Sequence, residues 1–200
     1  VTRPEIYFGE ITDWPVYVKT RQKEFNYPEG DANNYSTYEG TGGIQMGSLF
    51  RRLLLAWSVG DLTKVPFSDD VTADSALLIH RNIRERASQL APFLLFDQDP
   101  YIVVGTDGGL YWIMDAFTTS DRYPYARHLD VGDRSINYVR NSVKVVVDAY
   151  NGTTRFYVFD SEDPLIQSYQ KMFPKLFVPA SEMPDFLRSH VRYPEMLFRL

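Results

Sequence analysis

The chain has 200 residues and a net charge of −5, from 21 basic and 26 acidic side chains. An acidic balance argues against nucleic acid as the main partner, because phosphate binding needs a basic field. Cysteine is absent, which excludes disulfides, thiol catalysis and cysteine-ligated metal sites. We expect no transmembrane segment within these residues, because no apolar run approaches the length of a membrane span.

The length suits one domain, and we expect a single soluble domain over residues 1–200. Residues 1–45 are expected to form an arm or long loop, and residues 46–200 the main body. The chain starts at Val1 and stops inside an apolar pattern at residues 196–200, without a helix-capping residue. The sequence therefore predicts a portion excised from a larger protein.

Two short apolar pieces near the start lie next to prolines, at residues 6–8 and at Val16–Val18, and predict edge strands. Residues 26–43 are polar and rich in glycine, which predicts a long surface loop. This stretch lacks the Gly-Lys-Ser/Thr ending of a phosphate-binding loop. A flexible loop is therefore the favoured interpretation.

The first predicted helix spans residues 48–58, where large apolar side chains recur at helical spacing with two arginines opposite. We expect the apolar stripe to pack in the core. A helix lying on a membrane surface is the alternative. The stripe consists of Leu49, Phe50, Leu53, Leu54 and Trp57, and the arginines are Arg51 and Arg52.

A second helix is predicted between Asp74, a favourable N-cap residue, and Pro92, which biases the preceding residue away from helix. A third is expected from about residue 162 to residue 172, with Pro164 in its first turn. Prolines divide the remaining tail into short helical pieces. The buried stripe of the second helix is expected to be Ile79, Ile83, Ala87 and Leu90.

Residues 141–160 carry the strongest local signal, because Asn151-Gly152 lies between two apolar runs. This dipeptide favours a two-residue hairpin turn, since both residues accept positive φ. Such a turn places Asp148 opposite Arg155 on a mixed face. On the other face, which we expect to be buried, it pairs Val143, Val145, Val147 and Ala149 with Asp160, Val158, Phe156 and Thr154.

A second hairpin is predicted over residues 101–117, with either Asp107-Gly108 or Gly108-Gly109 at the centre of its turn. Residues 120–137 are expected to form another loop. Hairpins over residues 101–117 and 143–159, with helices before and after them, predict an α+β fold. In it, amphipathic helices pack against an antiparallel sheet.

The most suggestive chemical motif is Asp97-Gln98-Asp99, which follows an apolar run at the expected end of a strand or helix. Two carboxylates one residue apart can share a divalent cation, and Asp115 could supply a third. The alternative is that Asp97 and Asp99 only shape a turn before Pro100. We favour the turn and expect no cofactor, because so short a motif is a common false positive.

Several phrases stand out in order along nearly the whole chain: Tyr7-Phe-Gly-Glu10; Tyr38-Glu-Gly-Thr-Gly-Gly43; Arg51-Arg52; Ala91-Pro-Phe-Leu94; Asp97-x-Asp-Pro-Tyr101; Tyr111-Trp-Ile-x-Asp115; Tyr123-Pro-Tyr125; Asn137-Tyr-x-Arg-Asn-Ser-Val-Lys-Val-Val-Val-Asp-Ala-Tyr150; and His190-x-Arg-Tyr-Pro-Glu195. Together they resemble a widespread prokaryotic family of uncharacterised multi-pass membrane proteins. In that family a block of transmembrane helices precedes a long soluble region. The resemblance implies that this chain is part of that region, exposed outside the cytoplasmic membrane. It implies no catalytic residue, because the family has no established activity.

The leading functional hypothesis is a binding or interaction module. Its partners would be the rest of its own membrane-spanning protein, an envelope protein or a ligand. The high tyrosine content and the lack of a convergent catalytic set motivate it. The alternative is a divalent-metal-dependent enzyme that acts on envelope carbohydrate or a lipid-linked substrate through Asp97 and Asp99. These hypotheses differ in whether Asp97, Asp99 and Asp115 converge in one open pocket.

Overall fold

The computed structural model describes residues 1–30, 32–61, 68–132 and 134–199. The chain forms two compact units. The large unit comprises Val1–Glu10 and Asn82–Leu200, and the small unit comprises Ile11–Arg81. The arm over residues 1–45 and the main body over residues 46–200 stay a prediction. Within the small unit, Val16–Val18 and Ile44–Gln45 both pair with Ala76–Leu78.

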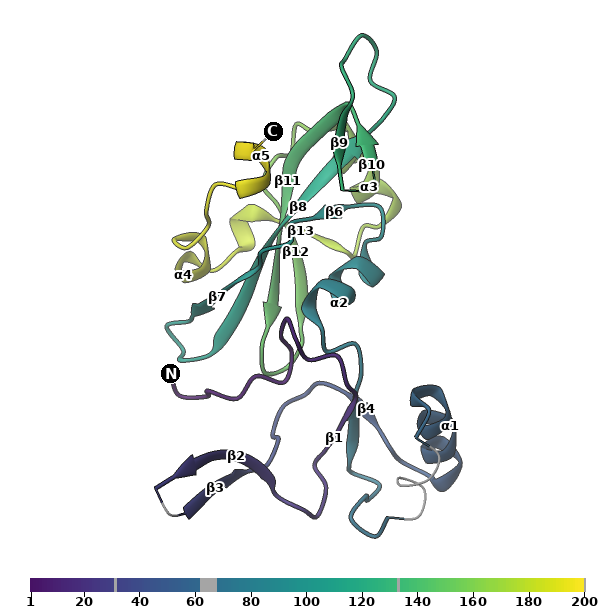
Figure 1. The fold of residues 1–200 in the computed structure, drawn as a ribbon, viewed down its shortest axis with the longest axis vertical. Coiled ribbons are helices and arrows are strands. Elements are labelled where there is room, and N and C mark those ends of the chain that lie inside the picture. Colours follow the sequence, from purple (N-terminus) through teal and green to yellow (C-terminus); the bar gives the residue numbers. More distant parts are fainter. Residues whose placement is uncertain (31, 62–67, 133, 200) are drawn as a thin grey trace. The chain divides into compact units, whose positions relative to one another are not determined.

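The large unit is built on a six-stranded sheet with the order β13-β12-β11-β8-β6, in which β7 also pairs with β8 (Figure 1). Neighbours are antiparallel except β12 and β13, which run parallel. The strands are β6 (Leu95–Phe96), β7 (Tyr101–Val104), β8 (Leu110–Ser120), β11 (Tyr138–Asp148), β12 (Thr154–Val158) and β13 (Phe177–Pro179).

Helices accompany this sheet, and the predicted α+β class is confirmed. They are α2 (Ile83–Leu90), α3 (Pro164–Met172), α4 (Asp185–Arg188), α5 (Glu195–Arg199) and the 3-10 turn η1 (Ala180–Glu182). The expected loop at residues 120–137 instead contains a small ribbon of β9 (Leu129–Val131) and β10 (Arg134–Ile136).

The hairpin of β11 and β12 forms, but its register differs by two residues from the predicted one. Val145 lies opposite Phe156, and Arg155 lies opposite Val146 rather than Asp148. The predictions of a two-residue turn and of an Asp148–Arg155 pair were therefore wrong. The reason is that the Asp148 carboxylate accepts hydrogen bonds from the backbone N–H groups of Tyr150 and Asn151, at 2.8 and 2.9 Å, and so closes a longer turn.

A slip of two residues leaves every side chain on its predicted face. Val143, Val145, Val147, Phe156 and Val158 are accordingly buried. The opposite face is mixed, as predicted: Arg155 is exposed, whereas Val146 and Tyr157 are buried where the C-terminal segment covers them. Met183 and Leu187 pack there against Ile113, Val146 and Tyr157.

Gly152 supplies the positive φ that the turn requires, at 72°. It also permits a close approach, since a Cβ at this position would lie 2.5 Å from the Phe8 ring. Residues 6–8 do not form the predicted strand. Instead the N–H groups of Tyr7 and Phe8 both donate to the Ala149 carbonyl at 2.9 Å, so the N-terminal segment packs against this turn.

The hairpin of β7 and β8 has neither of the predicted two-residue turns. Gly105 donates its N–H to the Gly109 carbonyl at 2.8 Å, which leaves residues 106–108 as a three-residue loop. Gly108 provides the positive φ, at 78°. Asp107 stabilises the loop by accepting from the Gly109 N–H at 3.0 Å.

The small unit contains a three-stranded sheet with the order β1-β5-β4 and a separate hairpin of β2 and β3. The second predicted helix was placed too early, because Asp74 precedes a buried strand, β5, and Asn82 is the N-cap of α2. The predicted loop at residues 26–43 overlaps the hairpin. The strands are β1 (Val16–Val18), β2 (Glu24–Glu29), β3 (Ala32–Ser36), β4 (Ile44–Gln45) and β5 (Ala76–Leu78).

Helix α1 (Leu49–Val59) lies within one residue of its predicted range at each end. It begins after Ser48, whose hydroxyl accepts from the Arg51 N–H. Its predicted orientation was wrong. Ala56 is fully buried, and Leu55 and Val59 pack with it against Met46, Val71 and Leu77. The apolar stripe of Leu49, Phe50, Leu53, Leu54 and Trp57 is exposed, because the helix packs against the core through Leu55, Ala56 and Val59 instead.

We expect Val147→Asp to unfold the large unit, because it places an unpaired carboxylate at a site that is 1% exposed, at a cost of several kcal/mol. Asp148→Ala should cost only about 1–2 kcal/mol, since it removes hydrogen bonds that close a turn. Arg155→Ala, at an exposed site, should change the free energy of unfolding by less than about 0.5 kcal/mol. Urea midpoints measure all three. A midpoint for Val147→Asp close to that of Arg155→Ala would contradict the assignment of Val147 to the buried face.

Candidate functional site

Asp97 directly follows β6, as predicted for a carboxylate at the end of an apolar strand. The Asp99 N–H donates to Asp97 Oδ1 at 3.3 Å, so the motif forms a local turn before Pro100, which is buried. The Asp97 N–H also donates to the Asp115 carbonyl on β8, at 2.9 Å. The sheet edge therefore fixes the position of the motif.

Asp115 lies in the middle of β8, opposite Lys144 on β11. Both side chains are buried and form an ion pair. The amide of Asn141 adds a hydrogen bond to Asp115 Oδ1 at 3.0 Å. The Asp115 carboxylate is thus compensated from within the protein. Removal of either charged partner would leave a buried charge, at a cost of about 3–5 kcal/mol.

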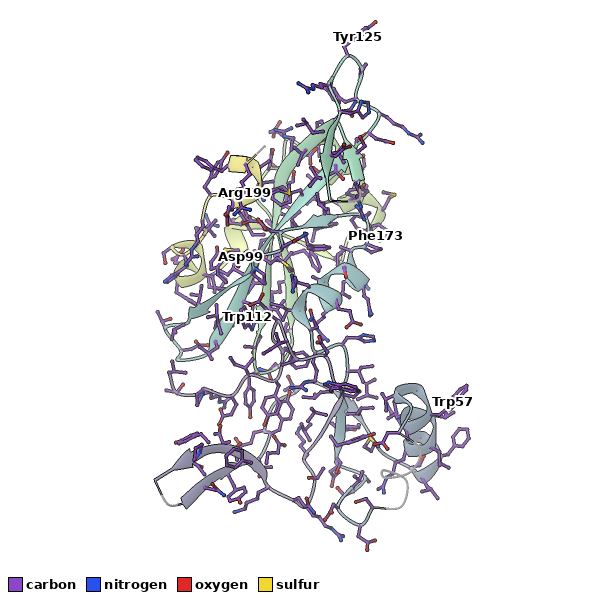
Figure 2. The ribbon with its side chains drawn as sticks, viewed as in Figure 1. Trp57, Asp99, Trp112, Tyr125, Phe173 and Arg199 are labelled. Atoms are coloured by element: carbon purple, nitrogen blue, oxygen red, sulfur yellow. The ribbon has the colours of Figure 1, made fainter. Side chains whose placement is uncertain are left out.

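The three predicted carboxylates meet in one pocket of about 170 Å³. A larger hollow of about 510 Å³ shares Asp97, Asp99 and Glu195 with it and is also lined by Asp130. Arg199 lines that hollow and pairs with Glu195. Figure 2 shows Asp99 and Arg199 in the same part of the large unit. The other residues that line the small pocket are Tyr101, Arg192, Tyr193 and Glu195.

The C-terminal segment is fastened to this pocket through Tyr101. The guanidinium of Arg192 lies over the Tyr101 ring, 4.2 Å from its centre. The Tyr101 hydroxyl donates to the His190 carbonyl at 3.0 Å and accepts from the Arg192 N–H at 3.3 Å. Burial raises the pKa of Tyr101 more than the hydrogen bond from Arg192 lowers it. The tyrosine therefore remains a neutral phenol that holds the wall of the pocket.

The two hollows are lined mainly by acidic side chains among their charged residues: Asp97, Asp99, Asp115, Asp130 and Glu195. None of the described residues that line the two hollows is a serine, threonine, cysteine or histidine. No group of three or more histidine, cysteine, aspartate or glutamate side chains is placed to hold a metal ion within the described ranges. Asp97 and Asp99 still present carboxylates to an open space, where they can accept hydrogen bonds from a positively charged group.

A second polar cluster lies inside the large unit around Asp163, the N-cap residue of α3. Its carboxylate accepts from the Ser142 hydroxyl at 2.6 Å, from the Tyr138 hydroxyl at 2.7 Å and from the Thr118 hydroxyl. It also accepts from the Leu165 N–H at 3.1 Å. Asp163, Ser142 and Thr118 are fully buried. Their hydrogen bonds join the start of α3 to β8 and β11.

Sequence reasoning missed Lys144, Tyr101, Arg192 and Glu195 as parts of the site. The pairing of β8 with β11 brings Lys144 to Asp115, and no local pattern indicates that pairing. The other three stand inside phrases that carry the family resemblance, Asp97-x-Asp-Pro-Tyr101 and His190-x-Arg-Tyr-Pro-Glu195. Those phrases were the one available signal that the two segments belong together.

The profile of an uncharacterised protein family, UPF0182, matches residues 1–200. The chain belongs to the UPF0182 family. It is 53% identical over 197 residues to a UPF0182 protein of Sulfurovum sp. (strain NBC37-1), covering 98% of this chain and 21% of that relative. It is 50% identical over 198 residues to one of Desulforamulus reducens, covering 99% of this chain and 21% of that relative. It is 52% identical over 201 residues to one of Methanospirillum hungatei JF-1, covering 98% of this chain and 22% of that relative.

These comparisons confirm the family that the sequence phrases indicated. The chain spans about a fifth of the length of the UPF0182 relatives it matches. No solved structure matches it. Within the residues that the structure describes, no helix has the length and apolar character needed to cross a membrane.

Because of the hydrogen bonds to Asp163, we expect the free energy of unfolding to fall at acidic pH. Burial acts to raise the pKa of Asp163, but the hydrogen bonds from Ser142, Thr118, Tyr138 and Leu165 outweigh it, and the pKa lies below its usual value. A lowered folded-state pKa adds stability above the unfolded-state pKa of about 4, and this stability is lost as pH falls through the folded value. Asp163→Asn should therefore reduce stability at pH 7 and flatten its decline below about pH 4. Urea unfolding across pH measures this, and an unchanged acid slope would contradict it.

Proposed function

We propose that this part of the UPF0182 protein is a binding module exposed outside the cytoplasm. Other segments of a longer polypeptide would hold the protein in the membrane. The observation that carries the binding role is the open pocket in which Asp97, Asp99 and Glu195 meet beside Tyr101 and Arg192. The short span of the chain relative to its relatives supports its place in a larger protein.

The charges around the pocket indicate the chemistry of its ligand. Acidic side chains outnumber basic ones in the lining, because Asp97, Asp99, Asp115, Asp130 and Glu195 line the two hollows against Arg192 and Arg199. Arg199 is paired with Glu195, and Arg192 is stacked on Tyr101. Asp99 and Asp130 are exposed in the same hollow. A ligand that brings an amine or several hydrogen-bond donors fits this lining, since charge-assisted hydrogen bonds to carboxylates are the strong ones. We infer an amine-bearing envelope component or partner segment.

The second candidate function is a divalent-metal-dependent enzyme that acts on envelope carbohydrate or a lipid-linked substrate. The convergence of Asp97, Asp99 and Asp115 in one pocket favours it, because a shared cation needs carboxylates from more than one element. The ion pair of Asp115 with Lys144 weighs against it, since that lysine already neutralises the buried carboxylate. We therefore rank metal-dependent catalysis below ligand binding.

Calorimetric titration with spermidine, used as a cationic probe, should show saturable binding to the 200-residue chain. Asp99→Asn should weaken it about fivefold, because one ion pair in partly screened surroundings contributes roughly 1 kcal/mol. Asp121→Asn is the matched control, since it removes the same charge at an exposed site away from the pocket lining. Equal losses in both variants would mean non-specific charge attraction and would contradict the proposal.

Titration with Mg²⁺, Mn²⁺ and Ca²⁺ separates the two candidate functions. We expect no saturable signal at millimolar concentration, because Asp97 and Asp99 form a local turn and Asp115 is held by Lys144. A saturable signal that is lost in Asp97→Ala would support the enzyme instead.

The location outside the cytoplasm can be tested by cysteine labelling, because these 200 residues contain no cysteine. Tyr125 is fully exposed in the segment between β8 and β9 (Figure 2). A Tyr125→Cys variant of the longer protein should react with a membrane-impermeant maleimide on intact cells, above the level of its parent. Labelling only after lysis would place the domain in the cytoplasm and contradict this part of the proposal.

A further inference from the structure

Helix α1 of the small unit presents its largest apolar side chains to solvent. Successive residues in a helix lie about 100° apart, so these five side chains fall within an arc of roughly 140°. Figure 2 shows Trp57 at the outer side of α1. The exposed fractions are 60% for Leu49, 71% for Phe50, 39% for Leu53, 47% for Leu54 and 70% for Trp57.

This apolar stripe is not ordinary surface scatter. Single exposed apolar residues are normal on a folded protein, but a contiguous patch indicates a surface that contacts something. The opposite side of α1 already packs against the small core through Ala56, Leu55 and Val59. The helix is thus held in the small unit by these three residues, while the apolar stripe faces solvent.

The charges on α1 indicate what the stripe contacts. The helix contains two arginines and no acidic residue, although the whole chain is acidic. Arg51 is exposed and lies about 60° from Leu54 around the helix, at the margin of the stripe. An apolar face of leucine, phenylalanine and tryptophan with a basic margin is typical of helices that lie in a lipid interface. Tryptophan and arginine both favour the headgroup level of such an interface.

We propose that α1 lies flat in the surface of an anionic lipid membrane. The stripe from Leu49 to Trp57 enters the boundary between headgroups and acyl chains, and Arg51 pairs with lipid phosphate. The helix has 11 residues, or about 16 Å, which is half of the roughly 30 Å hydrocarbon core. It therefore lies along the surface. This contact is separate from the pocket of the large unit and does not depend on what that pocket binds.

Co-sedimentation of the 200-residue chain with lipid vesicles tests this proposal by measuring its partition coefficient. Vesicles of phosphatidylcholine alone are compared with vesicles that also contain anionic phosphatidylglycerol. The chain should partition onto the vesicles, and more strongly onto the anionic ones. The double variant Phe50→Ser/Trp57→Ser should lower the partition coefficient about tenfold or more, because it removes two aromatic anchors. Both sites are exposed, and circular dichroism checks that the variant remains folded.

Trp14→Ser is the matched control, because Trp14 is an exposed tryptophan of the same unit, at 81% against 70% for Trp57. It should leave the partition coefficient unchanged. Arg51→Gln should reduce the preference for phosphatidylglycerol vesicles while leaving binding to phosphatidylcholine vesicles unchanged. Together these variants separate the apolar from the electrostatic part of the contact.

Three results would overturn the proposal. The first is no partition of the parent chain onto either vesicle. The second is an equal loss in Phe50→Ser/Trp57→Ser and Trp14→Ser, which would show that the stripe is not the contact. The third is a dimer, seen by light scattering, that forms in the parent chain without vesicles and is lost in Phe50→Ser/Trp57→Ser. In that case a second copy of the chain covers the stripe.

Discussion

The large unit depends on the antiparallel pairing of β8 with β11, two strands of 11 residues that are both covered by other elements. The register shifts between Arg140 and Val143, so β11 carries a bulge at residues 141–142. A bulge bends a strand and redirects its side chains. Here Asn141 reaches Asp115 at the pocket, and its neighbour Ser142 reaches Asp163 at the start of α3. One irregularity in one strand thereby connects the sheet both to the candidate site and to the helix.

Local sequence signals predicted the positions of the hairpin strands more accurately than the turns that connect them. Asn151-Gly152 correctly marked a turn, and the alternation from Val143 to Val158 correctly marked a buried face. The register failed because the carboxylate of Asp148 competes for the turn N–H groups, and this competition is invisible in a two-residue motif. Helix α1 shows the same limit. Periodicity located the helix, but periodicity alone cannot tell whether an apolar stripe meets a core or another kind of surface.

The candidate site was only partly predictable for a similar reason. Asp97 and Asp99 follow an apolar run, which placed them correctly at the end of a strand. The partner of Asp115 was not predictable, because Lys144 reaches it across a pairing between strands almost thirty residues apart in the chain. Glu195 reaches the same pocket from the last helix. Prediction of a buried ion pair requires knowledge of the tertiary fold, because a charged residue in a strand can equally well be exposed.

The wall of the pocket is held by groups that bind its backbone. Lys144 donates to the Arg192 carbonyl at 3.2 Å, and Tyr101 donates to the His190 carbonyl at 3.0 Å. Main-chain carbonyls are the same whatever side chain a residue carries, so these two bonds hold residues 190–192 independently of side-chain identity, and only the stacking of Arg192 on Tyr101 depends on it. Substitutions in this wall, other than at Arg192, can therefore change the side chains that line the pocket while its outline stays the same. With such a division between a fixed backbone and variable side chains, related proteins could share one scaffold and still differ in the charge and size of this pocket.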